Sequence, residues 1–424
     1  MKNLWHEFGA AAAIAVLQVA TVVAAVEQQT VGDCNQDGHV TVDELVIGVN
    51  IALGELQLSA CPTFDSSGDG QVTVEELTLA VNNALSGPPS GPAFIIATDF
   101  QTGSFATVGL DAPYPVSPVS AARRVNSDAV ARPHGGLVYV VNRFGGDSIQ
   151  VLDPSQDFAT RAQCSTGGGS NPQDIAFASS TKAYVARLGI PSLLIVNPNP
   201  QPDCSDFVRG TIDLSAYADS DGNPDMSQLA IVGDRLYVSL QRLQNFMPAE
   251  NGAIAVIDIT TDQEVTVVTL SAGNPFAETK GLTVVSGALV VPEVGAFQVN
   301  DGGLERVDLA TNTAQGFFIT EADLGGDITD FVLVSEHLGY AIVSQPDFSN
   351  VLEAFDPTTR TVTQTLLTSS SLSDVELDDR GELFVSDRST TQAGIRVFRA
   401  GDGVQLTQSP LGLGLPPFDI EFLP

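Results

Sequence analysis

The chain has 424 residues, of which 43% are hydrophobic and 16% are charged, so it is long enough to bury a large core in more than one domain. Its 18 basic residues face 51 acidic ones, which gives a formal net charge of −33. This charge repels nucleic acid phosphates and anionic membrane surfaces, so we expect neither as a partner. It favours cations and solubility outside the cell, although a halophilic origin would produce the same excess.

Residues 1–25 have the pattern of an export signal. A short polar start containing Lys2 precedes an apolar run from Ala10 to Val26, and small residues near Ala25 suit cleavage. The alternative is an uncleaved signal anchor, because a run of this length lies at the lower limit for crossing a bilayer. We therefore expect a secreted, periplasmic or cell-surface protein, with no other contact to a membrane.

Four cysteines in an exported chain predict two disulfides. Their spacing favours the pairs Cys34–Cys61 and Cys164–Cys204, each within one region of the chain. Free buried thiols are the alternative. No Cys-x-x-Cys pattern and no cluster of Cys and His indicates zinc.

A twelve-residue motif occurs twice, as DCNQDGHVTVDE from Asp33 and as DSSGDGQVTVEE from Asp65. Oxygen ligands at positions 1, 3, 5, 9 and 12, a backbone carbonyl at position 7 and a glycine at position 6 define a calcium-binding loop. The predicted ligands are Asp33, Asn35, Asp37, His39, Thr41 and Glu44 in the first loop and Asp65, Ser67, Asp69, Gln71, Thr73 and Glu76 in the second, with His39 and Gln71 offering their carbonyls. Calcium is therefore the expected cofactor.

Apolar residues follow each loop at the spacing of an amphipathic helix, which predicts a loop and an exit helix, twice, with the two apolar faces packed together. The residues are Val42, Leu45, Val46, Val49 and Leu53 after the first loop and Val74, Leu77, Val81 and Leu85 after the second.

This arrangement, over residues 31–87, resembles a type I dockerin, the small duplicated calcium module of secreted bacterial glycan-degrading systems. The resemblance implies a helical module that folds on calcium and binds a cohesin domain. The loops depart from the family pattern at their ends: Glu44 and Glu76 stand where Asp is usual, and Val42-Asp43 and Val74-Glu75 occupy the positions that contact the partner. After the module, the stretch SGPPSGP over 86–92 predicts a linker.

From residue 93 to the end, short β-rich runs alternate with turn residues. Seven strands that mostly carry an aromatic residue begin at 93, 137, 182, 235, 288, 338 and 382, with intervals of 44 to 53 residues. That period predicts the blades of a seven-bladed β-propeller, so the fold class is mainly β with a small N-terminal α-helical calcium module. The last strand, 418–423, is expected to close the ring inside the first blade. The stretch GLVYVVNRFGGDSIQVLDP resembles the YVTN-type bacterial β-propeller.

Aligning the innermost strand of each blade places mainly acidic residues at one position, which a closed ring brings to one mouth of the central channel. These residues are Asp128, Asp174, Gln228, Lys280, Asp330, Asp374 and Asp419. One hypothesis is a site for a cation or a polar ligand. The alternative is structural, because Asp side chains commonly accept backbone N–H bonds in turns.

A second acidic loop, DSDGNPD, lies within the propeller. Asp219, Asp221, Asn223 and Asp225 surround a glycine there and offer oxygen ligands for a further calcium ion. The loop is shorter than the twelve-residue motif and lacks its closing Glu.

The sequence contains neither a G-x-S-x-G nor an H-E-x-x-H motif, and His134 and His337 stand near turns with no evident base or nucleophile beside them. We therefore expect a calcium-binding protein whose propeller is a scaffold for an unidentified protein or glycan. One alternative is a metal-assisted, lactonase-like hydrolase at the axial acids. Another is a component of a polysaccharide-degrading assembly, held by a cohesin.

Overall fold

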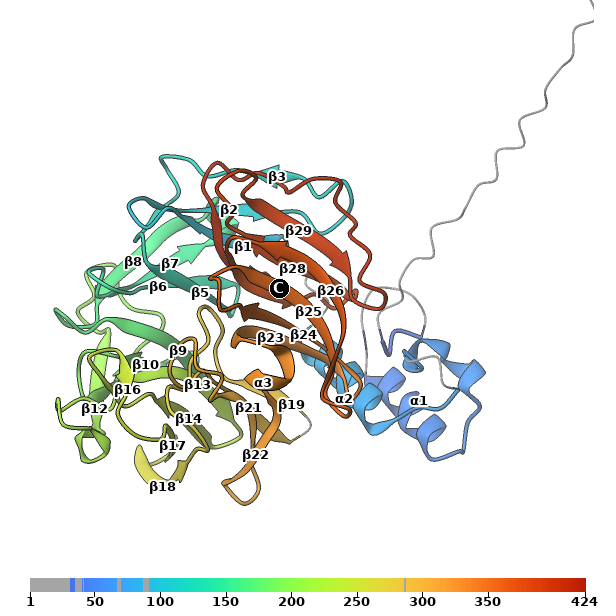
Figure 1. Ribbon diagram of the computed structural model, residues 1–424, viewed down its shortest axis with the longest axis horizontal. Coiled ribbons are helices and arrows are strands. Elements are labelled where there is room, and N and C mark those ends of the chain that lie inside the picture. Colours follow the sequence, from blue (N-terminus) through green and yellow to red (C-terminus); the bar gives the residue numbers. More distant parts are fainter. Residues whose placement is uncertain (1–30, 35–39, 41, 67–69, 87–90, 286) are drawn as a thin grey trace, which may run out of the picture.

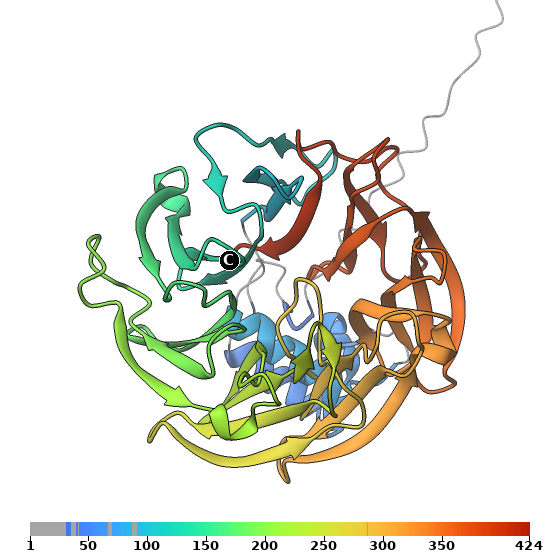
Figure 2. The ribbon, with the colours of Figure 1, turned by 60° about the vertical axis from the view of Figure 1, so that its left-hand side comes forward.

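The computed structural model describes residues 31–34, 40, 42–66, 70–86, 91–285 and 287–424 (Figure 1). Seven antiparallel sheets stand around a common axis (Figure 2), so the predicted seven-bladed β-propeller is confirmed. We number the blades in chain order, with blade 1 containing the first strand of the propeller. No helix among the described residues is long and apolar enough to cross a membrane.

Each blade has an innermost strand next to the axis, which pairs with a second strand. The innermost strands of blades 1 to 7 are β30 (Pro417–Phe422), β5 (Ala129–His134), β9 (Pro172–Ser179), β13 (Met226–Val232), β19 (Thr283–Val285), β23 (Asp327–Ser335) and β27 (Leu372–Leu377). The second strands are β1 (Ala93–Thr98), β6 (Leu137–Asn142), β10 (Lys182–Arg187), β14 (Arg235–Leu240), β20 (Ala288–Glu293), β24 (Leu338–Ser344) and β28 (Glu382–Asp387).

The third and outermost strands complete the blades. The third strands are β2 (Gly103–Val108), β7 (Ser148–Asp153), β11 (Ser192–Val196), β17 (Ala253–Asp258), β21 (Gly303–Asp308), β25 (Asn350–Asp356) and β29 (Gly394–Arg399). The outermost strands are β3 (Val116–Ser117) with β4 (Arg124–Val125), then β8 (Ala159–Ser165), β12 (Val208–Asp213), β18 (Gln263–Thr269), β22 (Thr313–Thr320) and β26 (Thr361–Ser369). Blade 7 has three strands in its sheet, a short hairpin of β15 (Leu243–Gln244) and β16 (Met247–Pro248) extends blade 4, and helix α3 (Glu321–Leu324) precedes β23.

The first and last strands of the propeller meet in one blade. β30 pairs with β1 in antiparallel register, with Ile420 opposite Ile95. The innermost strand of blade 1 therefore comes from the C-terminus and its other strands from the start of the propeller, which joins the two ends of the ring.

The core lies between the blades. All six residues of β1 and all six of β6 are buried, because both faces of each sheet are covered by neighbours, and this explains their continuous apolar runs. Tyrosines on second strands reach the next blade: the Tyr184 hydroxyl donates to Asp262 at 2.5 Å and the Tyr237 hydroxyl to Asn312 at 3.3 Å. The aromatic residues of these two repeats thus contribute to the junctions between blades 3 and 4 and between blades 4 and 5.

The N-terminal region contains helices α1 (Val42–Ala52) and α2 (Val74–Ser86), with single turns of 3-10 helix at Leu58–Ala60 and Pro62–Phe64. Both α-helices begin at position 10 of their loops. Phe64 is fully buried, and its ring lies 2.3 Å from the position that a Cβ on Gly48 would take. A glycine is therefore needed where α1 crosses this ring.

The apolar face predicted for α1 is only partly correct. Val46, Val49 and Leu53 are 54%, 44% and 69% exposed, whereas Gly48 and Ile51 are buried. The helix is turned so that the closing acid of the first loop and Gly48 face the core, which leaves an apolar row on the surface.

Candidate functional sites at the axis and between blades

Four of the predicted axial acids have one structural role in common. Each lies on an innermost strand, is almost completely buried and accepts a backbone N–H from the innermost strand of the following blade. The bonds are Asp174 to Leu229 at 2.8 Å, Asp330 to Val375 at 2.8 Å, Asp374 to Ile420 at 2.5 Å and Asp419 to Ala131 at 2.8 Å. These carboxylates connect neighbouring blades, so their donors lie mostly in the next blade and not in their own turn.

The other three residues of the predicted ring differ. In blade 2, Val130 pairs with Val141 and precedes Ala131, so Val130 occupies the position equivalent to the four acids. Asp128 lies two residues earlier, where it forms an ion pair with Arg143 at 2.6 Å. The Gln228 amide donates to the carbonyl of Lys280 at 2.7 Å.

Two largely buried cations connect blades at the axis. Arg132 of blade 2 contacts Asp174 at 2.8 Å and Glu421 at 3.0 Å, and it donates to the carbonyl of Thr279 at 2.8 Å. Lys280 forms an ion pair with Glu376 in blade 7. The segment that carries Thr279 and Lys280 is therefore held at the axis by side chains from blades 2 and 7.

Sequence reasoning missed Arg132, Glu376 and Glu421. A signal was present, because Glu376 and Glu421 stand two residues after Asp374 and Asp419 and share their face of the strand. Nothing in the sequence around Arg132 indicated its role, because its partners lie in other blades.

Burial governs the electrostatics of this axial network. It raises the pKa of Asp174 and Glu421 above their usual range, and it raises the pKa of Asp419 to about 7. Burial also disfavours the charge on Arg132, but the carboxylates of Asp174, Glu421 and Asp419 outweigh it and raise the pKa of Arg132. Backbone donors and the two cations thus engage most oxygens of the axial carboxylates, whereas Oδ1 of Asp374 is buried without a hydrogen-bond partner among the described residues.

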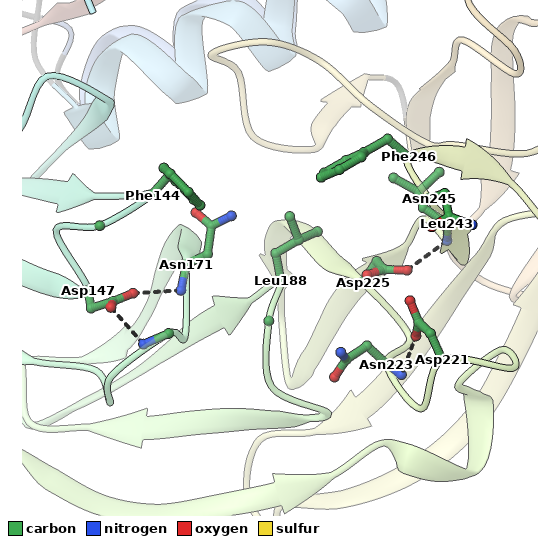
Figure 3. Close-up of a pocket in the computed structure, with 13 residues that line it drawn as sticks. Phe144, Asp147, Asn171, Leu188, Asp221, Asn223, Asp225, Leu243, Asn245 and Phe246 are labelled. Atoms are coloured by element: carbon green, nitrogen blue, oxygen red, sulfur yellow. Dashed lines mark hydrogen bonds between the residues drawn. The ribbon is translucent and has the colours of Figure 1, made fainter. Parts of the chain in front are cut away.

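A second site lies between blades 2, 3 and 4, where a cavity of about 520 Å³ opens at one face of the propeller (Figure 3). We call it the interblade cavity. Phe144 comes from the β6–β7 loop, Leu188 from the β10–β11 loop and Phe246 from the β14–β17 loop, while Asp221 and Asp225 come from the connection that precedes β13. Loops between second and third strands and connections between blades emerge at the same face, because the strands of a blade alternate in direction.

The predicted acidic loop forms one wall of this cavity. The Asp219 carboxylate accepts the N–H of Asp221 at 2.9 Å, and the Asp221 carboxylate accepts the N–H of Asn223 at 2.9 Å. Carboxylate oxygens of Asp219, Asp221 and Asp225 lie within 4.8 Å of one another. Burial, together with the negative charges of Asp221 and Asp219, raises the pKa of Asp225 to about 7.

Hydrogen bonds hold the blade 2 side of the cavity in place. The two oxygens of Asp147 accept the N–H groups of Gly169 at 2.7 Å and Asn171 at 2.8 Å (Figure 3). The loop that carries Phe144 is thereby connected to the segment that leads into β9.

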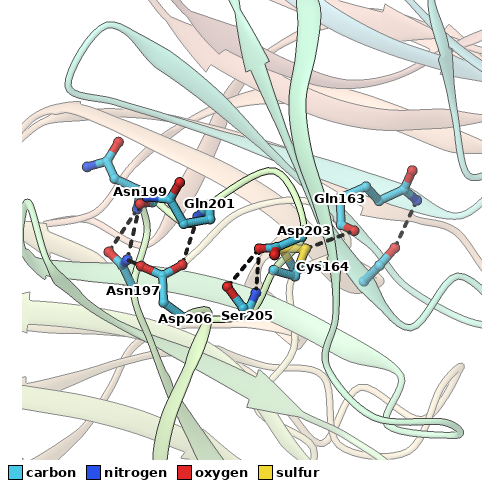
Figure 4. Close-up of a disulfide and its surroundings, with 10 residues drawn as sticks. Gln163, Cys164, Asn197, Asn199, Gln201, Asp203, Ser205 and Asp206 are labelled. Atoms are coloured by element: carbon cyan, nitrogen blue, oxygen red, sulfur yellow. Dashed lines mark hydrogen bonds between the residues drawn. A yellow bond between two sulfur atoms is a disulfide. The ribbon is translucent and has the colours of Figure 1, made fainter.

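The two predicted disulfides, Cys34–Cys61 and Cys164–Cys204, are confirmed. The second joins β8 of blade 2 to the loop before β12 of blade 3, beside a hydrogen-bonded turn in which Asp206 accepts the N–H of Gln201 at 2.7 Å (Figure 4). This disulfide therefore links covalently two of the blades that line the interblade cavity. Disulfides are typical of proteins in oxidising compartments, whereas export itself stays a prediction.

The N-terminal loops are described in part. Asn35, Asp37, His39, Thr41, Ser67 and Asp69 lie outside the described residues, as does the signal segment 1–25. The predicted ligands within them are Asp33, Glu44, Asp65, Gln71, Thr73 and Glu76.

Both closing acids of the loops are 5% exposed and fold back onto their own loops. Glu44 accepts the N–H of Cys34 at 2.9 Å, and Glu76 accepts the N–H of Thr73 at 2.9 Å. Calcium binding by these loops stays a prediction.

The two propeller histidines have structural surroundings. The His134 ring stacks on Phe177 with centroids 4.1 Å apart, and burial lowers its pKa. His337 lies 3.6 Å from Asp356 and is largely exposed. Neither arrangement resembles a nucleophile activated by a base.

No protein-family model and no curated protein matches this sequence. Among solved structures, the chain is similar to the dihydro-heme d1 dehydrogenase NirN, at 13% identity over 88% of this chain and 92% of that one, with a TM-score of 0.51. It is also similar to a functionally unknown protein from Desulfotomaculum acetoxidans, at 12% identity over 79% and 99% of the two chains, with a TM-score of 0.51. The WD40 β-propeller domain of Doa1 aligns at 11% identity over 67% and 83%, with a TM-score of 0.45. At these identities the likenesses concern the fold alone: the chain is a seven-bladed β-propeller protein.

Proposed function

We propose that the protein is an exported calcium-binding protein whose propeller is a scaffold that binds a protein or a glycan. The scaffold proposal rests on the contacts that the axial acids make. Asp174 and Asp419 each accept backbone N–H bonds and face the guanidinium of Arg132. A metal ion would have to replace these contacts, so a metal-assisted hydrolase at the axis is not favoured.

Calcium binding is supported by the paired loop motifs and by the burial of Glu44 and Glu76 at their ends. A buried carboxylate is stabilised by a cation beside it, and a module built around two such loops gains much of its folding free energy from the ion.

The test follows backbone hydrogen exchange by mass spectrometry with calcium and with excess chelator. Chelator is expected to remove protection from residues 42–86 while leaving the strands of the propeller protected. A chain carrying Glu44→Gln and Glu76→Gln should exchange in calcium as the wild type does in chelator. Equal protection of 42–86 in all samples would contradict the calcium proposal.

A panel of lactones and esters tests the scaffold against the hydrolase alternative. The wild-type chain in calcium is expected to show no turnover above buffer. Calcium-dependent turnover would overturn the scaffold proposal.

A second candidate function is docking to a cohesin-like partner through α1. The exposed row Val46, Val49 and Leu53 favours it, because these residues follow one another along one side of the helix at the surface. Binding to a panel of cohesins, compared with Val49→Ser and Leu53→Ser, tests this candidate. Failure of the wild type to bind any cohesin would remove it.

A further inference from the structure

We propose that the interblade cavity is a saccharide-binding site, in which a calcium ion held by Asp219, Asp221 and Asp225 coordinates sugar hydroxyls between Phe144 and Phe246. This inference rests on the proposed scaffold function and assigns its ligand class.

The first argument concerns oxygens that have no protein partner. Asp225 is 8% exposed and lines the cavity, yet only one of its oxygens is hydrogen-bonded, to the N–H of Leu243 at 2.7 Å. Oδ2 of Asp219 is buried and has no hydrogen-bond partner in the described part of the chain. Leaving the buried oxygen of Asp219 unpaired is unfavourable, so it points to a ligand, and the second oxygen of Asp225 is available to the same ligand.

The second argument concerns charge. Three carboxylates converge within 4.8 Å of one another, and no Lys or Arg nitrogen lies within 4.0 Å of them among the described residues. Like charges at this distance repel in a partly buried site unless a cation lies between them. Carboxylate oxygens at this spacing suit calcium, which takes about 6–8 oxygen ligands. Three carboxylates leave coordination positions open, and Asp221 and Asp225 line the cavity on that side.

The third argument concerns the aromatic rings. Phe144 and Phe246 are 75% and 82% exposed and stand on different sides of the cavity, with Leu188 between them (Figure 3). Neither ring contributes to the core, although burying a phenylalanine is favourable. The C–H groups of a sugar face pack against the negative π face of an aromatic ring. A saccharide therefore offers both features that this cavity needs, an apolar face for the rings and hydroxyls for the ion.

Other ligand classes fit less well. The carboxylates repel anions, and a wholly apolar ligand would cover them without satisfying their oxygens. The amides of Asn171 and Asn245, also in the lining, can donate to and accept from hydroxyl groups.

Exposed phenylalanines also occur at this face outside the cavity, and they provide matched controls for the two cavity rings. Phe100, Phe297 and Phe348 are 55%, 48% and 74% exposed and lie in the corresponding loops of blades 1, 5 and 6. With the two cavity rings, five blades present a phenylalanine at the same face.

The first experiment counts calcium. The full chain, freed of calcium, is titrated with calcium alone by isothermal calorimetry and compared with Asp221→Asn, which keeps the shape of the side chain but removes its charge. The variant is expected to bind one ion fewer than the wild type. Equal stoichiometry would overturn the proposal, and this result is independent of the N-terminal loops because Glu44 and Glu76 are intact in both chains.

The second experiment measures binding of linear neutral hexasaccharides of glucose, mannose and xylose in calcium and in chelator. Phe246→Ala and Phe144→Ala are expected to weaken binding about tenfold each, and chelator and Asp221→Asn to abolish it. The matched control is Phe348→Ala, which removes an equally exposed ring from blade 6 and should bind as the wild type does.

Three results would overturn this inference: no hexasaccharide bound in calcium, binding unaffected by chelator, or equal losses in Phe246→Ala and Phe348→Ala. A protein partner lost in the Phe144 and Phe246 variants would replace the saccharide while leaving the scaffold proposal intact. Failure of the scaffold proposal itself would appear separately, as turnover of lactones or esters.

Discussion

At the scale of single residues, the axial aspartates show that one residue type can have two different structural roles. Asp330 is fully buried and accepts N–H bonds from Phe331 and Val375. Asp128, which the sequence places in the same ring, is an ion-pair partner at the channel mouth with 28% of its side chain exposed. In the sequence both aspartates precede an apolar run and look the same; only the position of the next blade distinguishes them.

Replacing Asp330 by alanine is expected to destabilise the propeller by about 2–4 kcal/mol, because two buried N–H groups lose their acceptor. The matched variant Asp128→Ala should cost less than about 1 kcal/mol, since its ion pair is partly exposed. Urea unfolding, followed by far-ultraviolet circular dichroism, measures the free energy of unfolding of both variants. Equal losses would contradict the structural role assigned to Asp330.

Glu293 in blade 5 predicts a pH dependence. Burial, together with the neighbouring carboxylate of Glu305, raises the pKa of Glu293 to about 10. The folded chain therefore holds a proton that the unfolded chain releases near the ordinary pKa of Glu, and the stabilisation due to this proton is lost as pH rises toward 10.

The variant Glu293→Gln keeps the shape and cannot lose that proton. Between pH 6 and pH 9 the wild type is expected to lose stability relative to the variant, by at most about 1.4 kcal/mol per pH unit. Urea unfolding across this range measures the difference. Parallel pH profiles of the two chains would show that Glu293 is ionised in the folded state.

At the scale of elements, the sequence predicted the positions of the strands well, but it predicted less well which side chains of a helix are buried. The seven repeated strands from β1 to β28 follow from local alternation of apolar runs and turns, which does not depend on the rest of the chain. The orientation of α1 did not follow, because Gly48 has no hydrophobic weight in a periodicity argument. Its lack of a side chain is what admits the Phe64 ring and turns Val46 and Val49 outward.

The disulfide Cys164–Cys204 yields a prediction about one junction between blades. It spans a sequence separation of 40 residues, and cross-linking a loop of that size stabilises a chain by up to about 4 kcal/mol. Cys164→Ala with Cys204→Ala should lower stability by up to that amount, with increased hydrogen exchange centred on β8 and β12. Cys34→Ala with Cys61→Ala is the control and should leave exchange in the propeller unchanged. Uniform exchange across all blades in the first variant would contradict the local role.

At the scale of the whole molecule, closure of the ring depends on the C-terminal strand. β30 pairs with β1. Its Asp419 carboxylate also accepts the N–H of Ala131, and its Ile420 N–H donates to the Asp374 carboxylate. Removing residues 417–424 should therefore open three contacts of the ring at once.

The truncated chain is expected to unfold at a much lower temperature than the full chain or to aggregate through the exposed edge of β1. Removal of residues 1–91 is the control, since every strand pairing of the propeller lies after them, and it should preserve the propeller transition in calorimetry. A C-terminal truncation that melts like the control would show that the ring closes without β30.

The sequence by itself determined two features that are written in short stretches, the period of the blades and the pairing of four cysteines by region. These depend on residues close together in the chain, where periodicity, turn chemistry and spacing act directly. The tertiary structure decided the rest, because the deciding contacts join distant residues. Asp419 meets Ala131 across 288 positions, and Arg132 meets Thr279 across 147. Only closure of the ring occupies the axial acids with backbone donors, and only the juxtaposition of blades 2 to 4 places two exposed phenylalanines beside the 219–225 loop.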